Sequence, residues 1–153
     1  MTAPVPPRAI FTGKLFTVGK LILFTHTVMG ILFIICGKIA GLSGWPSLTI
    51  IRGLLMGCLA GFAMAALQLL LSMRIRSFAI PIGISLIGGV LGLVLTSMNL
   101  GMFWPYSLLA LGMNANGRDV LGTTDTIIFI ITCFCFTLLF TGIATRQLSK
   151  KDT

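Results

Sequence analysis

The sequence predicts an all-α integral membrane protein with four transmembrane helices, both chain ends in the cytoplasm, and a short interfacial or re-entrant helix before the last span. Of its 153 residues, 56% are hydrophobic and 9% are charged, and the mean hydropathy is +1.06, whereas a soluble domain is about one quarter charged. Long uncharged windows recur, several near the roughly 20 residues that a membrane helix needs. The basic residues between them are unevenly distributed, which indicates the orientation.

The first span is expected at about residues 18–37. Leu21–Gly37 is uncharged for 17 residues, and it reaches span length when the three residues before it are included, because the charge of Lys20 can snorkel to the interface. Residues 1–17 are expected to form a cytoplasmic segment, and they do not resemble a secretory signal peptide. The window Ile39–Ile51 contains glycine, tryptophan and proline and is expected to be a loop.

Two further windows each suit one span. Gly53–Met73 has 21 residues and Thr126–Thr145 has 20, so spans are expected at about 53–73 and 126–145. Ser77–Gly117 is ambiguous, because its 41 residues can hold one crossing or two.

The basic residues decide how often Ser77–Gly117 crosses. One crossing puts eight Lys and Arg on one side against three on the other, whereas two crossings divide them six to five. The positive-inside rule favours the uneven division, so the third span is expected at about 78–98 within a single domain, 1–153. The eight are Arg8, Lys14, Lys20, Arg74, Arg76, Arg146, Lys150 and Lys151, and the three are Lys38, Arg52 and Arg118.

Residues 101–118, GMFWPYSLLALGMNANGR, are therefore expected to be an outer interfacial segment. Tryptophan and tyrosine suit the headgroup region, and proline favours the first turn of a helix. The segment is a candidate outer gate or substrate-contact surface, and simple interfacial anchoring is the open alternative. The candidate residues are Trp104, Pro105, Tyr106, Asn114 and Asn116.

Glycines recur every four residues in the second and third spans. This spacing puts small residues on one helix face and predicts close helix packing, within the chain or at a subunit interface. The residues are Gly53, Gly57, Gly61, Gly88 and Gly92.

Ionisable side chains are rare inside the expected spans. His26 is ionisable, but no span contains an acidic partner for a proton relay, so we expect a neutral imidazole bonded to a backbone carbonyl or a neighbouring helix. Gln68 is expected to bond across helices, and Arg52 to mark the outer end of its span.

The remaining patterns exclude several functional classes. The net charge of +8 comes from 11 Lys and Arg against three acids, but these basic residues flank apolar runs, so no nucleic-acid partner is expected. No Walker A motif, paired carboxylates, catalytic triad or HExxH motif occurs. The four cysteines lie in apolar runs and are interpreted as packing residues. We therefore expect no catalytic residues, cofactor or metal site, and either a membrane scaffold or a transport subunit powered by another chain.

Three stretches resemble the bacterial ABC-2-type permeases, in particular the branch that exports lantibiotics or bacitracin for self-immunity. They are APVPPRAIFTGKL, LLLSMRIRSFAIPIGISLIGGVLGL and WPYSLLALGMNAN, and the likeness covers roughly residues 4–150. The resemblance implies a permease subunit in the bacterial cell membrane, driven by a separate ATP-binding subunit and paired with a second permease subunit. Such permeases usually have six spans, so this chain is expected to lack the first two.

The resemblance also implies contact positions for the ATP-binding subunit. They precede the first span and occupy the turn between the second and third spans, where attraction to membrane lipid is the open alternative. An alternative function is that of a small non-transport membrane immunity or assembly protein. The candidate contact residues are Pro6, Pro7, Arg8, Gly13, Lys14, Arg74, Arg76 and Ser77.

Overall fold

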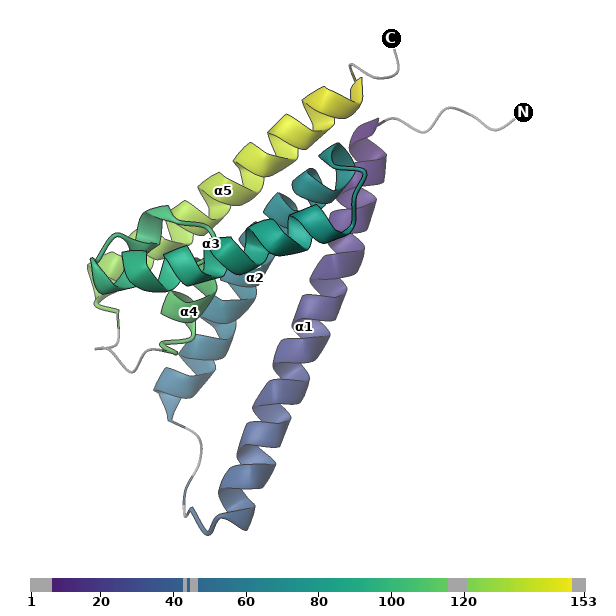
Figure 1. Ribbon diagram of the computed structural model, residues 1–153. Coiled ribbons are helices and arrows are strands. Elements are labelled where there is room, and N and C mark those ends of the chain that lie inside the picture. Colours follow the sequence, from purple (N-terminus) through teal and green to yellow (C-terminus); the bar gives the residue numbers. More distant parts are fainter. Residues whose placement is uncertain (1–6, 43, 45–46, 116–120, 150–153) are drawn as a thin grey trace.

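The computed structural model describes residues 7–42, 44, 47–115 and 121–149, and within them the chain is helical with no strand (Figure 1). The elements are α1 (Pro7–Ile39), α2 (Leu48–Arg74), α3 (Ala79–Ser97), the 3-10 turn η1 (Gly101–Phe103), α4 (Leu108–Gly112) and α5 (Thr123–Ser149).

Helices α1, α2, α3 and α5 are each long and apolar enough to cross a membrane. The predicted all-α fold with four membrane helices is therefore confirmed, and the chain is a multi-pass membrane protein. A short helix, α4, precedes the last span as expected.

Helix α1 is longer than the expected first span. It begins at Pro7, a residue that suits the first helical position because its missing N–H would have no partner there. Its 33 residues correspond to about 50 Å of helix, whereas the hydrocarbon core is about 30 Å thick. Residues 8–17 are thus part of the same continuous helix as the span.

The beginning of α1 packs against the bundle. Phe11 is fully buried and belongs to a cluster with Leu70 at the end of α2 and Ala144 near the end of α5. The beginning of α1, the end of α5 and the α2–α3 turn consequently lie at the same end of the molecule, the top in Figure 1. We refer to it as the termini end.

Helix α2 is the centre of the structure, because it contacts α1, α3, α4 and α5. Small residues on α2 are buried and allow these close contacts. A second cluster joins Ala60 of α2 to Leu108 of α4 and to Phe129 and Cys133 of α5. The buried residues of α2 are Gly57, Ala60, Ala63, Ala66 and Leu70.

Three helices end in the same way, with one residue in the left-handed conformation. Gly41, Asn99 and Asn114 have φ values of 77°, 60° and 50° and follow α1, α3 and α4 respectively. In each case the N–H of this residue and the N–H of the residue after it bond back to carbonyls of the last helical turn, as in Gly41 N to Lys38 O at 3.1 Å and Leu42 N to Gly37 O at 3.0 Å. This is the Schellman arrangement, for which glycine and asparagine are the favoured residues.

Candidate functional site

The segment between α3 and α5 folds back into the bundle. The indole Nε1 of Trp104 donates a hydrogen bond to the carbonyl oxygen of Gly88 at 2.8 Å. Gly88 lies halfway along α3, ten residues from Met98 at its C-cap. The segment is therefore re-entrant relative to α3, and it does not lie flat across the end of the helices.

Tyr106 penetrates furthest. Its ring lies so close to Gly88 that a Cβ there would be 2.4 Å from the tyrosine Cδ2, and the side chain is only 9% exposed. The amide Nε2 of Gln68 donates to the Tyr106 hydroxyl at 3.5 Å. Gln68 is six residues before Arg74, the last residue of α2, which is about 9 Å of helix. The sequence predicts Tyr106 in the headgroup region, whereas in the structure its contacts lie deep in the bundle.

Ser107 fixes the turn that brings these rings inward. It is 1% exposed, and its hydroxyl donates to the carbonyl oxygens of Gly101 and Trp104. Its backbone nitrogen lies 3.2 Å from the position that a Cβ of Gly92 would occupy. The absence of side chains at Gly88 and Gly92 therefore creates room for Tyr106 and Ser107.

Helix α4 packs on α2 by a similar close approach. A Cβ at Gly112 would lie 3.0 Å from the backbone carbonyl carbon of Met56, and Gly53 faces the backbone of Met113. Gly57 faces the side chains of Met113 and His26. Five glycines are expected to pack helices. Gly61 is the one among them whose neighbouring atoms all belong to another long helix, because a Cβ there would contact only Ile22 of α1.

Asn114 has a backbone role that the sequence interpretation did not assign. Its positive φ of 50° ends α4, and the N–H of Ala115 bonds to Ala110 O at 2.9 Å. Asn116, the other asparagine proposed for the outer surface, lies outside the described residues. Pro105, which lies between Trp104 and Tyr106 in the sequence, is half-buried.

Two polar residues of the spans have specific partners. The imidazole Nδ1 of His26 lies 2.9 Å from the carbonyl oxygen of Ile22, which is the contact with a backbone carbonyl that the sequence predicts. Arg52 does more than mark the end of a span, because its Nη2 donates to Leu121 O at 2.7 Å and to the hydroxyl of Thr126. Arg52 thus connects the beginning of α2 to the beginning of α5.

The candidate contacts for an ATP-binding subunit share the termini end. Gly13 and Lys14 on α1 and Arg74, Arg76 and Ser77 in the α2–α3 turn are exposed. Pro7 begins α1, Arg8 follows within the helix, and Pro6 lies outside the described residues. Arg146 in the last turn of α5 is also exposed, and the sequence interpretation left it out of the candidate set.

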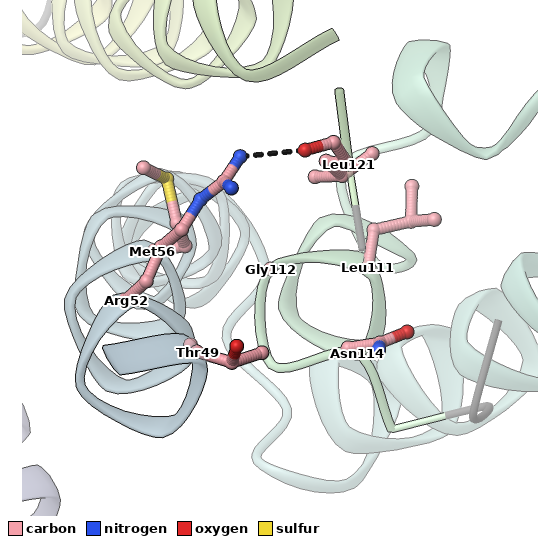
Figure 2. A pocket seen from close by; sticks show the side chains of 8 residues that line it. Thr49, Arg52, Met56, Leu111, Gly112, Asn114 and Leu121 are labelled. Atoms are coloured by element: carbon pink, nitrogen blue, oxygen red, sulfur yellow. Dashed lines mark hydrogen bonds between the residues drawn. The ribbon is translucent and has the colours of Figure 1, made fainter. Parts of the chain in front are cut away.

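The described residues offer little for metal or substrate chemistry. Among them, no group of three or more His, Cys, Asp or Glu side chains is close enough to hold a metal ion. A cavity of about 20 Å³ lies between α2 and α4 at the end opposite the termini (Figure 2). It is large enough for a water molecule.

Comparison with known proteins identifies the family. Residues 1–92, which include α1, α2 and most of α3, match the model of the ABC-2 family transporter proteins. Searches of curated proteins and of solved structures returned no match for this chain. Members of the family form the membrane component of a transporter, and membership implies association with an ATP-binding subunit. Because the match covers more than half of its length, the chain belongs to the ABC-2 transporter family.

Proposed function

We propose that the chain is the membrane-spanning subunit of an ABC exporter in a bacterial plasma membrane that protects the cell from a peptide antibiotic of the lantibiotic or bacitracin kind. The observation that carries the proposal is the family match, which covers the segment before the first span and the α2–α3 turn.

The termini end is the proposed docking surface for the ATP-binding subunit. Its exposed cations come from three different helices or turns, with Lys14, Arg76 and Arg146 as examples. Phe11 packs the first turns of α1 against α2 and α5, so a movement of the docked subunit is transmitted to three helices through one apolar cluster. Attraction to anionic lipid is the competing explanation for the same charges.

Co-purification tests the docking surface. A tagged wild-type chain is expected to retain the ATP-binding protein encoded beside it, and the double variant R74E/R76E is expected to lose it. Lys38→Glu is the matched control, because Lys38 is exposed at the opposite end of α1. Retention of the ATP-binding protein by R74E/R76E would exclude this docking surface.

A second permease subunit is also proposed. Five consecutive residues of α1, 31–35, are each 40% to 51% exposed, so this part of the helix is apolar and uncovered on every side. Lipid covers such a surface in a monomer, and a second copy or a related chain covers part of it in a dimer. Cysteine cross-linking of the Ile31→Cys variant in membranes, in a chain whose native cysteines are replaced, distinguishes the monomer from the dimer.

The alternative is a small membrane immunity or assembly protein that acts without transport. It is favoured by the tight packing of the segment around Tyr106, whose side chain is 9% exposed and lies against Gly88. This alternative predicts that protection against the peptide persists when every neighbouring ATPase gene is deleted. Loss of protection on that deletion supports the exporter.

A further inference from the structure

The cavity between α2 and α4 brings one cation and two neutral polar side chains together. It is lined by Arg52 and Thr49 of α2, by Asn114 after α4 and by Leu121 before α5. Figure 2 shows Arg52 and Leu121 on one side of the cavity, with Thr49 and Asn114 on the other. The apolar part of the lining comes from Met56 and Leu111.

The guanidinium of Arg52 is only partly used by the fold. Both of its hydrogen bonds come from Nη2, and both acceptors, Leu121 O and the Thr126 hydroxyl, are neutral. Among the described residues, the hydrogen bonds of this half-buried guanidinium go to uncharged oxygens, and none of them involves Nε or Nη1. A guanidinium bonds more strongly to an anionic oxygen than to a neutral one, so its remaining donors favour an anionic ligand.

We infer that this cavity binds the phosphate group of a phospholipid headgroup, with Arg52 as the cationic ligand and Thr49 and Asn114 as hydrogen-bond donors. Phosphate oxygens accept charge-assisted hydrogen bonds from guanidinium groups more strongly than neutral acceptors do. Threonine hydroxyl and asparagine amide groups donate to the same oxygens.

The size and surroundings of the cavity favour a lipid over free phosphate. At about 20 Å³, it admits a single oxygen and not a whole phosphate ion. The rest of the ligand must therefore be held outside the cavity. The neighbouring surface of α2 is apolar and exposed, with Leu48 80%, Ile51 46% and Leu55 62% exposed, so acyl chains can lie along it while the headgroup reaches Arg52.

The test is a titration of purified protein in neutral detergent, with bound lipid counted by native mass spectrometry. Phosphatidylglycerol is the probe, and diacylglycerol, which has the same tails without the phosphate, is the chemical control. Arg52→Gln is expected to weaken phosphatidylglycerol binding about tenfold, because it removes a charge-assisted hydrogen bond. Lys38→Gln, which removes a cation from the same end of the bundle, is expected to change nothing.

Two additional variants keep the test valid if Arg52→Gln disturbs the connection to α5. Thr49→Val removes only a donor from the cavity, and Asn114→Gly removes the amide while permitting the positive φ. Each is expected to weaken binding about threefold, which corresponds to one neutral hydrogen bond. Thr126→Val removes a bond of Arg52 outside the cavity and is expected to leave lipid binding intact.

Three results would overturn the inference. Equal phosphatidylglycerol binding by wild type, Arg52→Gln and Thr49→Val would show that the cavity binds no phosphate group. A matching loss of diacylglycerol would show that the variants act on the apolar surface. Displacement of phosphatidylglycerol by millimolar inorganic phosphate, with no preference for the lipid, would show a site for free anions. None of these readouts depends on transport, so they stand apart from the proposed export function.

Discussion

The indole of Trp104 donates its hydrogen bond to Gly88 O at 2.8 Å, halfway along α3. This bond joins the re-entrant segment to the middle of a membrane helix. Trp104→Phe retains an aromatic ring and removes the donor. We expect a loss of about 0.5–1.5 kcal/mol in the free energy of unfolding, measured by SDS titration. Unchanged stability would mean that the indole N–H contributes nothing.

The contact between Gly88 and Tyr106 gives a steric prediction. Gly88→Ala places a methyl group 2.4 Å from the tyrosine Cδ2, so the re-entrant segment must shift, at a cost of about 1–3 kcal/mol. Gly89→Ala is the matched control, because no atom lies within 4 Å of its Cβ position.

A second substitution at Tyr106 then tests the cause. Adding Tyr106→Ala to Gly88→Ala removes the clash, so the double variant is expected to be less destabilised than the sum of the two single variants. Simple additivity would show that the two residues do not interfere.

The role of Asn114 is tested by separating its backbone from its amide. If the positive φ of 50° is what matters for the fold, Asn114→Gly retains stability, whereas Asn114→Ala loses about 1 kcal/mol. Thermal unfolding of the purified variants measures the difference. Resistance to the peptide antibiotic then reports on the amide, because a substrate-contact role requires that Asn114→Gly lowers resistance at equal protein level.

The gate proposal for the re-entrant segment has its own test. Replacing Trp104 and Tyr106 together by leucine removes the bonds to Gly88 and Gln68 while keeping apolar volume. If the segment acts as a gate, resistance falls at unchanged membrane insertion. Full resistance at equal protein level would leave these rings as packing residues.

The packing of α1 at the termini end predicts that two phenylalanines of this helix contribute differently to the free energy of unfolding. Phe11 is fully buried against Leu70 and Ala144, whereas Phe24 is 68% exposed. Phe11→Ala is expected to cost about 3–5 kcal/mol through the cavity it leaves, and Phe24→Ala much less. SDS titration of both variants checks this, and equal effects would mean that the first turns of α1 are not docked on the bundle.

The number and type of the membrane helices could be predicted from the sequence, because uncharged windows reflect the thickness of the bilayer directly. The helical start of α1 could not, because Lys14 and two threonines interrupt the apolar run. The available signal was the spacing of Phe11 and Leu15, which puts two apolar residues on one helical face, and both contribute to the cluster at the termini end.

The re-entrant segment could be predicted in outline only. A composition of tryptophan, proline and tyrosine is typical of the headgroup region. The sequence therefore predicts a shallower position in the bundle for Tyr106 than the structure shows. The room for its ring comes from Gly88 and Gly92, whose spacing of four equally predicts a contact between two helices. Sequence spacing identifies the small-residue face but not the element that occupies it.

The central claim is that the termini end faces the cytoplasm and the re-entrant segment enters from outside. Substituted-cysteine labelling tests it in whole cells, in a background where the four native cysteines are replaced. The chain carrying Leu42→Cys, in the exposed α1–α2 connection, is expected to react with an impermeant maleimide in intact cells. The chain carrying Ser77→Cys, in the α2–α3 turn, is expected to react only after lysis. Labelling of Ser77→Cys but not Leu42→Cys in intact cells would contradict the proposed orientation, and with it both the docking surface and the outer gate.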